Sequence, residues 1–402
     1  MKIVIVTPIL FDKSSPFNHL FKDMIEAWLA EGHEITRIVA CESLDDDGYK
    51  MRIESDKIKY VPVVRKKAKK SNVISRYISD TLANIKMARK IKKINGAEIL
   101  IEDVCYCSHW SVKKAKKKKM KVVALLQDVW PDNAVASGLI SNGGLIYKFF
   151  EFWQKRVYKK ADKIICISSD MKQFIINKGV KEDKLEVVHN WGYTDETVNI
   201  GWEQNEFVKK YHLDKSLFYA VYAGNVGRMQ NVELVVRTAQ KLSNQPKIKF
   251  LIIGDGVNRE QIEHMVEEQK LDNITFLPMQ PKELATSVYS AASVNLIPLV
   301  EGGIKTALPS KTGVVLSCGK PIIACVDKDS EFAKLIESNE CGVAVSPTDE
   351  NELAQAIIDV YNGKIVFSMQ KLQRVFCDNF SRSVNVQKYK ECLVDEKVAI
   401  DG

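Results

Sequence analysis

Apolar runs of strand length alternate with longer amphipathic stretches along most of the chain. In the second half these runs indicate buried strands, because each is short, rich in β-branched or aromatic residues, and closed by glycine, proline or a polar loop. The predicted strands are residues 218–223, 248–253, 274–277, 293–298 and 321–325. Helical patterns lie between them, most clearly at residues 231–242 and 259–270. This alternation predicts βαβ units and a parallel sheet.

The first half of the chain repeats the pattern. Its predicted strands are residues 1–8, 34–41, 98–101, 121–126 and 163–167, with helical patterns at residues 19–31 and 145–160. Because 402 residues exceed the usual size of one core, two α/β domains are expected. The polar stretch 192–204 is the linker candidate, which places the domains at residues 1–195 and 196–380. Residues 381–402 are then a C-terminal helix and tail, whose return to the N-terminal domain is left open.

Glycines follow two of the predicted strands in the second half. Gly224-Asn225-Val226-Gly227 ends the first, and Gly254-Asp255-Gly256 ends the second. Glycine permits positive φ and close approach of another backbone, and ligands of parallel sheets bind at the carboxyl ends of the strands. A helix starting just after the first turn would direct free N–H groups at an anion beside Arg228. An ordinary strand-to-helix turn is the alternative.

The net charge of +8 is concentrated in two lysine-rich runs, residues 65–70 and 113–121. A solvated surface is one interpretation, and binding to anionic lipid or to nucleic acid are the others. No nucleic-acid motif or interleaved aromatic accompanies these runs, so lipid is favoured and no nucleic-acid partner is predicted. Residues 145–160 mix large aromatics with Lys and Arg at helical spacing, which fits a helix packed on its own sheet or one lying on an anionic membrane.

Several other classes of protein are disfavoured. No stretch approaches the roughly 18 apolar residues of a membrane span, and the N-terminal apolar run is too short for a secretory signal. The nine cysteines and six histidines lack the spacing of a metal site. We therefore interpret the cysteines as reduced thiols of a cytoplasmic protein, and predict no metal and no cofactor.

Seven segments together resemble the family 4 glycosyltransferases of the GT-B fold, in which two doubly wound domains face each other across a cleft. The segments are residues 161–169, 187–191, 222–228, 250–256, 273–277, 308–311 and 319–324, in the order that the family has them. The resemblance implies a nucleotide-sugar donor on the C-terminal domain and an acceptor on the N-terminal domain. It also implies retention of anomeric configuration without a required metal.

Within that family, residues 127–132 and 308–311 are similar to bacterial transferases that build O-antigen and capsule repeat units, several of which handle N-acetylated amino sugars. The implied reaction moves a sugar from a UDP-sugar to a polyprenyl-diphosphate-linked acceptor. The implied location is peripheral, on the cytoplasmic face of the cell membrane. Two alternatives stay open: a non-catalytic GT-B partner subunit, and a nucleotide-sugar epimerase of similar fold.

The chemistry assigns roles to individual residues. Breaking a bond between sugar and diphosphate develops negative charge on the leaving group, so Arg228, Lys311 and the amides of the first glycine loop are the candidates to stabilise it. Glu331 is the candidate for the donor sugar, and Asp128 for orienting or deprotonating the acceptor. A helix cap or a surface salt bridge is the alternative for each carboxylate. The remaining predicted contacts are Gly224, Asn225, Gly227, Gly254, Asp255, Met279, Pro309, Ser310 and Thr312 for the nucleotide sugar, and Phe17 and Asn18 for the acceptor.

The chain departs from the family pattern at several of its sites. Two glutamates that the family commonly places near the ribose are replaced by Thr306 and Val314, and Asn231 stands near a usual phosphate-binding lysine. Many relatives have a sugar-contacting histidine where this chain has Gln127 and Asp128. The N-terminal loop at residues 14–18 lacks the usual glycines, which weakens the assignment of an acceptor-phosphate site.

Overall fold

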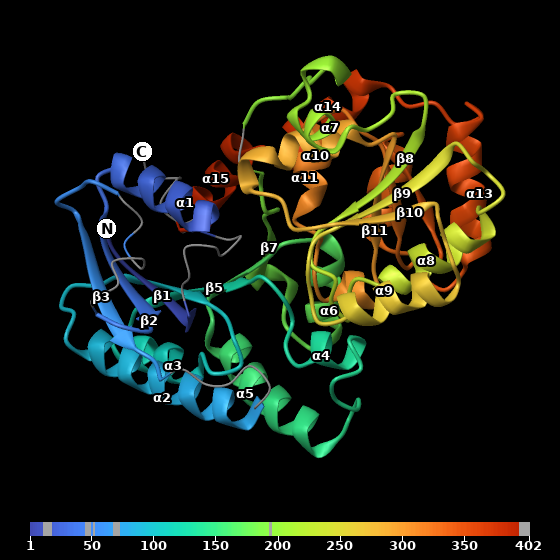
Figure 1. Cartoon of the computed structure of the whole chain (residues 1–402). Helices are drawn as coiled ribbons and strands as arrows, with labels where there is room; N and C mark the ends of the chain where they lie inside the picture. The colour runs from blue at the N-terminus through green and yellow to red at the C-terminus, as the bar shows by residue number, and fades with distance from the viewer. Residues whose placement is uncertain (11–17, 45–49, 51–52, 67–72, 193–194, 394–402) are drawn as a thin grey trace. The chain divides into compact units, whose positions relative to one another are not determined.

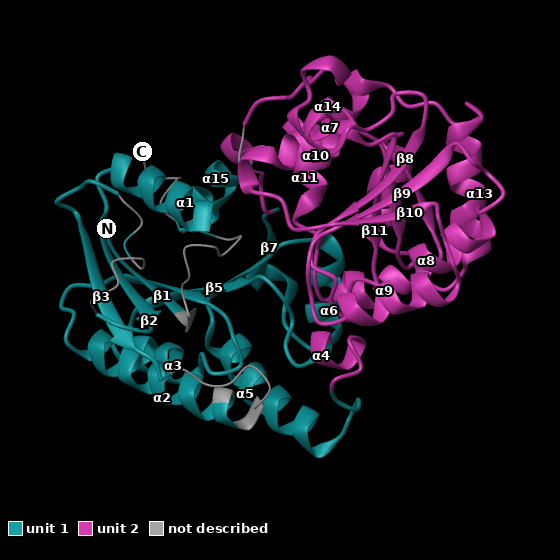
Figure 2. Ribbon diagram, in the orientation of Figure 1, with its two compact units in different colours: residues 1–132, 140–189, 385–402 teal, residues 133–139, 190–384 magenta. Residues whose placement is uncertain are grey.

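The computed structural model describes residues 1–10, 18–44, 50, 53–66, 73–192 and 195–393. The chain divides into two compact units, coloured separately in Figure 2. Unit 1 comprises residues 1–132, 140–189 and 385–402, and unit 2 comprises residues 133–139 and 190–384. The chain therefore changes unit after His189, within a few residues of the boundary expected at 195. The C-terminal residues group with unit 1.

Unit 1 contains a seven-stranded parallel sheet in the order β3-β2-β1-β4-β5-β6-β7. Its strands are β1 Lys2–Leu10, β2 Glu34–Cys41, β3 Ile58–Val64, β4 Ile99–Asp103, β5 Lys121–Leu126, β6 Lys163–Cys166 and β7 Leu185–Val187. Its helices are α1 Asn18–Ala30, α2 Val73–Lys92, α3 His109–Lys117, α5 Leu145–Lys160, α6 Ser169–Asn177 and α15 Arg382–Glu391. The short helix α4 Asp132–Ala136 starts at the last residue of the first segment of unit 1 and otherwise belongs to unit 2. Figure 1 shows α2, α3 and α5 beneath one face of this sheet, with α1 and α15 over the other. An ion pair of 2.9 Å between Lys390 and Glu31 joins α15 to the end of α1.

Unit 2 contains a six-stranded parallel sheet in the order β10-β9-β8-β11-β12-β13. Its strands are β8 Phe218–Ala223, β9 Ile248–Ile253, β10 Ile274–Leu277, β11 Val294–Pro298, β12 Ile322–Cys325 and β13 Gly342–Val345. Its helices are α7 Glu206–Tyr211, α8 Val232–Lys241, α9 Arg259–Glu268, α10 Ala285–Ala291, α11 Lys311–Ser317, α12 Glu331–Ser338, α13 Glu350–Tyr361 and α14 Met369–Asn379. Both sheets thus have the doubly wound α/β architecture expected from the alternating pattern.

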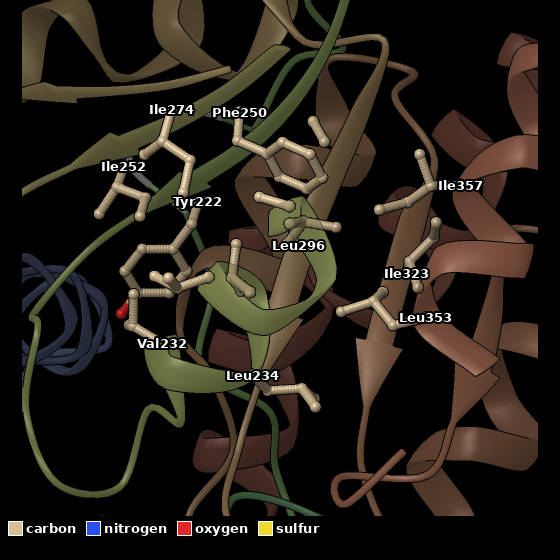
Figure 3. Close-up of a cluster of buried hydrophobic side chains, with 14 of the residues drawn as sticks. Tyr222, Val232, Leu234, Phe250, Ile252, Ile274, Leu296, Ile323, Leu353 and Ile357 are labelled. Carbon is tan, nitrogen blue, oxygen red and sulfur yellow. The ribbon is translucent and has the colours of Figure 1, made fainter. Parts of the chain in front are cut away.

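The core of unit 2 explains why its strands are apolar along their whole length. Side chains of β8 alternate between two clusters: Ala220 and Tyr222 pack toward α8, α9 and α13, whereas Tyr219 and Val221 pack toward α7 and α10. Figure 3 shows the first cluster, in which Phe250, Leu296 and Ile323 from β9, β11 and β12 meet side chains of α8 and α13. A parallel sheet covered on both faces requires this pattern.

Three strands, β3, β7 and β13, were not predicted from the sequence, and β7 is only three residues long. β3 is an edge strand that contains Pro62 and pairs on one side with β2, and proline within an apolar run argues against a central strand. β13 is only four residues long and begins with Gly342. Among the described residues, no helix is both long enough and apolar enough to cross a bilayer.

Asn205 provides a test of how unit 2 is held together. Its buried side-chain oxygen accepts hydrogen bonds from the N–H groups of Phe207 at 2.9 Å and Val208 at 3.1 Å, and its amide donates to the Ser287 carbonyl at 2.8 Å. We expect Asn205→Ala to lower the free energy of unfolding by about 2 kcal/mol, because it removes a helix cap and leaves a buried carbonyl without its donor. Asp349→Ala, which removes an exposed cap of α13, should cost about 1 kcal/mol or less. Urea unfolding followed by circular dichroism measures both, and equal losses would contradict this account.

Candidate functional site

The loops after β8 and β9 are packed backbone against backbone. Gly224 has φ of +153° and Gly254 has φ of +142°. A Cβ atom at Gly254 would lie 1.8 Å from the carbonyl oxygen of Gly224, and one at Gly256 would lie 2.3 Å from that of Val226. Only glycine fits both positions, because any side chain would overlap the neighbouring loop.

The hydrogen bonds of this contact decide which amides are available to a ligand. The Gly224 N–H donates to the Ile253 carbonyl at 2.9 Å, and the Val226 N–H donates to the Asp255 carbonyl at 2.8 Å. Within the described part of the chain, the N–H groups of Asn225 and Gly227 have no acceptor. The loop therefore offers alternate amides rather than a continuous row, an arrangement that suits an anion.

Lys311, the first residue of α11, approaches this loop from the segment after β11, the strand that pairs with β8. Its Nζ lies 3.9 Å from the centre of the Tyr222 ring and 3.3 Å from the position that a Cβ on Gly224 would occupy. The structure thus brings together Lys311 and the glycine loop, as the sequence predicted. The Tyr222 hydroxyl donates a hydrogen bond to the Asn225 carbonyl of the same loop.

The Lys311 ammonium is buried and has no hydrogen-bond partner among the described residues. Burial lowers the pKa of Lys311 to about 7. A buried cation without an anion is costly to keep, and such groups concentrate at functional sites. The local electrostatics therefore favour an anionic ligand beside Gly224.

Arg228 lies on the exposed end of the loop, and no ion pair or hydrogen bond of its guanidinium is found among the described residues. The helix predicted at residues 231–242 is present as α8, which begins at Val232, so residues 228–231 separate its first turn from the glycines. Asn231 makes the turn with φ of 32° and donates through its side-chain amide to the carbonyls of Pro347 at 2.7 Å and Leu299 at 3.3 Å. Near the position where the family commonly has a phosphate-binding lysine, this chain therefore has Asn231, whose side chain holds two backbone carbonyls in place.

The residues predicted for the nucleoside lie on adjacent loops, because the ends of β9 and β10 pair at Ile253 and Leu277. Asp255 accepts from the Gly256 N–H at 2.8 Å, and the Met279 side chain is 55% exposed. Arg259, which the sequence analysis did not identify, donates to the carbonyls of Gly254 and Leu277 and so joins the two loops. An arginine just after Gly-Asp-Gly at a helix start was the signal for it.

The start of α11 uses its hydroxyl groups differently. The buried Thr312 hydroxyl donates to the Pro309 carbonyl at 2.8 Å, whereas Ser310 is exposed and makes no side-chain cap. The residues at the two positions where the family commonly has glutamates are also buried. Thr306 donates to the Gly303 carbonyl at 3.1 Å, and Val314 is buried.

Glu331 is the first residue of α12, where its carboxylate forms an exposed ion pair of 2.7 Å with Lys334. This contact corresponds to the surface salt bridge considered as the alternative for that residue. Its contact with a sugar stays a prediction. Asp327, in the same loop, accepts from the Gly302 N–H at 2.9 Å and so joins the loops after β11 and β12.

In unit 1, two carboxylates stand at the ends of neighbouring strands. Asp128 follows β5, and Asp103 ends β4, its partner in the sheet. Burial and the negative charge of Asp128 raise the pKa of Asp103 to about 7, although Arg37 opposes this. Sequence analysis missed Asp103, although it lies two residues after the predicted strand 98–101. Phe17 lies outside the described residues, and Asn18 opens α1.

The loop that carries Asp128 is anchored at its other end. Asp132 accepts a hydrogen bond from the Tyr147 hydroxyl at 2.9 Å and pairs with Lys178 at 2.9 Å. Glu151 lies 3.5 Å from the same ammonium. Among the described residues no group of three or more His, Cys, Asp or Glu side chains could hold a metal ion.

Comparisons with known proteins match both units of this chain. The family model described as Glycosyltransferase Family 4 matches residues 18–195, and the one described as Glycosyl transferases group 1 matches residues 218–363. The chain belongs to the family 4 glycosyltransferases. As a member, it is a nucleotide-sugar-dependent enzyme, as the sequence predicted.

Relatives of this family 4 glycosyltransferase include WbjE of Pseudomonas aeruginosa, named as a probable glycosyltransferase, which is 26% identical over 276 residues and 68% of each chain. WcaI of Escherichia coli K12, whose name assigns it to colanic acid biosynthesis, is 24% identical over 59% of this chain and 58% of its own. Among solved structures, sucrose-phosphate synthase from Thermosynechococcus elongatus has a TM-score of 0.77 at 16% identity, covering 98% of both chains. Anabaena HepE in complex with UDP-glucose has a TM-score of 0.71 at 13% identity, covering 98% of this chain and 99% of its own. These likenesses confirm the predicted GT-B fold.

The buried ammonium of this family 4 glycosyltransferase should make the protein less stable in the absence of a ligand. Because burial lowers the pKa of Lys311 to about 7, the folded chain binds fewer protons than the unfolded chain between about pH 7 and pH 10. The penalty is therefore fully present below pH 7 and disappears as the pH rises through the ordinary lysine value.

We expect Lys311→Met to raise the free energy of unfolding at pH 6 by on the order of 1 kcal/mol, and by less at pH 9.5. Urea unfolding at both pH values measures this difference. Lys247→Met, which removes an exposed ammonium, should give no gain that depends on pH. A lower free energy of unfolding for Lys311→Met at pH 6 would show that the buried ammonium does not destabilise the folded protein.

Proposed function

We propose that this glycosyltransferase transfers a sugar, of the N-acetylated amino-sugar class, from a UDP-sugar to a polyprenyl-diphosphate-linked acceptor in cell-surface polysaccharide synthesis. The observation that carries the proposal is the buried Lys311 ammonium, which lies beside the glycine loop without a hydrogen-bond partner among the described residues. A diphosphate would supply the missing anion. Two loop amides without acceptors and the exposed Arg228 add donors for it.

The same groups supply the chemistry of the reaction. As the bond between sugar and diphosphate breaks, negative charge grows on the leaving oxygen, and fixed donors aimed at it lower the barrier. Lys311 and Arg228 would neutralise this charge without a metal ion, and we propose net retention of anomeric configuration. The proposed acceptor residue is Asp128, whose pKa burial raises to about 6 and whose negative charge helps to raise the pKa of the adjacent Asp103.

The pathway and the donor base rest on the relatives. The name of WcaI refers to colanic acid, a polysaccharide, and the HepE structures contain UDP, glucose or UDP-glucose. These names support cell-surface polysaccharide as the product and UDP as the carrier. The assay below also tests sugar transfer against the two alternatives considered from the sequence, a non-catalytic subunit and an epimerase.

Replacing Arg228 or Lys311 by Ala should lower turnover by more than about tenfold with folding intact, because each removes a positive charge from the leaving diphosphate. The assay measures UDP release and product formation by the full chain, with UDP-sugars and a synthetic polyprenyl-diphosphate-linked acceptor. Arg374→Ala is the matched control, since Arg374 is an exposed arginine of α14 paired only with Asp378 among the described residues.

Each alternative has its own signature in this assay. Sugar interconversion without an acceptor would identify an epimerase, and the absence of any turnover with bound UDP would identify a non-catalytic subunit. A rise in melting temperature with UDP-sugars but not with GDP- or TDP-sugars would support uracil as the base of the donor. Full activity of both alanine variants would refute the roles of Arg228 and Lys311, and loss of activity in EDTA would refute metal independence.

We further propose that unit 1 binds an anionic membrane through neighbouring faces of α2 and α5. The inner face of α5 packs on its own unit, since Phe150, Val157 and Tyr158 are buried. Its outer face is exposed and apolar. The contact of Tyr77 with Phe150, with ring centres 5.1 Å apart, places α2 beside α5. The docking surface consists of Ile78, Leu82, Leu145, Ile146, Phe149 and Phe152, each at least 48% exposed.

Positive charge accompanies the docking surface. The Arg156 guanidinium lies 4.2 Å from the centre of the Phe152 ring, and α5 ends in Lys159 and Lys160. Aromatic side chains with flanking Lys and Arg suit the headgroup region of an anionic bilayer. Of the lysine-rich run at 65–70, residues 67–70 lie outside the described part of the chain.

Exchanging both Phe149 and Phe152 for Ser should weaken binding to vesicles of phosphatidylglycerol and phosphatidylcholine by about tenfold or more, because two aromatic side chains no longer enter the interface. Sedimentation with vesicles measures the bound fraction. The control pair Val366→Ser and Met369→Ser removes exposed apolar side chains from unit 2 and should leave binding unchanged. Equal binding of wild type to neutral and anionic vesicles would contradict the proposed role of charge.

A further inference from the structure

Tyr222 joins the two parts of the proposed donor site. It lies on β8, is 1% exposed, and belongs to the core shown in Figure 3. Its ring lies under the Lys311 ammonium, 3.9 Å from the ring centre. Its hydroxyl donates to the Asn225 carbonyl in the glycine loop. One rigid side chain therefore contacts both the cation and the loop that the proposed function assigns to the diphosphate.

The ring replaces the anion that a buried ammonium would otherwise need. No hydrogen-bond acceptor within the described chain faces Lys311 Nζ, and the face of an aromatic ring attracts a cation at this distance. The attraction is stronger where water is excluded, as it is here. The ring thus provides the one attractive contact that the described residues give to the ammonium.

The hydroxyl fixes the orientation of a peptide group. With the Asn225 carbonyl held by Tyr222, the N–H of the next residue, Val226, points to the Asp255 carbonyl at 2.8 Å. The N–H groups of Asn225 and Gly227 are then the ones without acceptors in the described chain. Burial raises the pKa of Tyr222, so the hydroxyl keeps its proton and remains a donor.

We infer that Tyr222 is a positioning residue of the donor site, whose ring holds the Lys311 ammonium beside Gly224 and whose hydroxyl orients the peptide after Asn225. The inference rests on the proposed function for its consequence in catalysis. The geometry between ring, ammonium and loop does not depend on that function. Tyr222 acts through Lys311 and the loop backbone, without itself touching the substrate.

The charged and titratable groups around Lys311 are few. The ring of Tyr222 faces it from β8, and Tyr289 of α10 acts on Tyr222 rather than on Lys311. Burial is the one influence on the pKa of Lys311, which falls to about 7, and no carboxylate of the described chain opposes it. A change in the ring should therefore appear directly in the ionisation of Lys311.

The first experiment measures that ionisation without any ligand. In the full chain carrying lysine labelled with carbon-13 at Cε, the Lys311 signal is assigned by its absence in Lys311→Met and titrated by NMR. Tyr222→Leu should lower the pKa of Lys311 by about one unit, because the cation loses its ring contact. Tyr222→Phe keeps the ring and should leave the pKa within a few tenths of a unit of the wild-type value.

Two further variants keep this test decisive. Tyr219→Leu removes a buried tyrosine of the same strand that packs into the opposite cluster, and it should leave the ionisation of Lys311 unchanged. If Tyr222→Leu does not fold, position 222 can carry phenylalanine or 3,4,5-trifluorophenylalanine, which are similar in shape but differ in the charge at the ring face. The fluorinated ring should lower the pKa of Lys311 relative to phenylalanine, and equal values would overturn the inference.

The second experiment concerns the hydroxyl and uses the transfer reaction. Tyr222→Phe should raise the KM for the UDP-sugar by about fivefold with little change in kcat, because the Asn225 peptide is no longer held. An unchanged KM would overturn the role of the hydroxyl. If the wild-type chain binds no UDP-sugar, the proposed function fails, while the ligand-free titration still decides the role of the ring.

Discussion

The contact between the Gly224 and Gly254 backbones is the constraint on which the proposed donor site depends. The parallel strands β8 and β9 end at the same edge of the sheet, and their loops touch where a Cβ atom at Gly254 would lie 1.8 Å from the Gly224 carbonyl oxygen. This contact occupies the N–H groups of Gly224 and Val226 and leaves alternate amides for a ligand. Because Gly224 has no side chain, the Lys311 ammonium can also approach the loop backbone there. A side chain at Gly254 would overlap the Gly224 backbone, and one at Gly224 would lie against the Lys311 ammonium.

In a site of this kind, a group that favours ligand binding lowers the stability of the protein without its ligand. The protein maintains a buried ammonium whose protonation burial opposes, and an aromatic ring compensates for only part of the cost. The part of the ammonium's attraction for negative charge that the ring does not satisfy is then available to a ligand. It favours most an anion that carries more negative charge in the transition state than in the ground state. The ring is a neutral partner, so it holds the cation in place without competing for it as a carboxylate would.

The sequence predicted most of the fold because buried parallel strands are short, apolar and regularly spaced, and those of unit 2 from β8 to β12 have this pattern. It did not predict β3, whose Pro62 suits only an edge, or β7 and β13, which are only three and four residues long. In the site, Lys311 and the glycines could be predicted because loop glycines and a family motif identify them locally. Arg259 and Asp103 also follow predicted strands, but they were missed because their roles depend on carbonyls and charges that the fold brings close. The helix after the glycine loop was predicted to within one residue, but the side-chain contacts of Asn231 were not, because its carbonyl partners lie more than 60 residues away in the sequence.

The anchoring of Asp132 links two features of unit 1 that the sequence separates. Tyr147 belongs to α5, the helix whose opposite side carries Phe149 and Phe152, and its hydroxyl bonds to Asp132 at the end of the loop that bears Asp128. Lys178 of the segment after α6 completes the connection through its ion pair with the same carboxylate. A displacement of α5 along its axis would therefore move the Asp128 loop through the Tyr147 hydroxyl, against the ion pair of Asp132 with Lys178. Chimeras that exchange this helix between relatives should be cut so that residues 147, 132 and 178 travel together, since a helix transplanted without its two partners would no longer control where that loop rests.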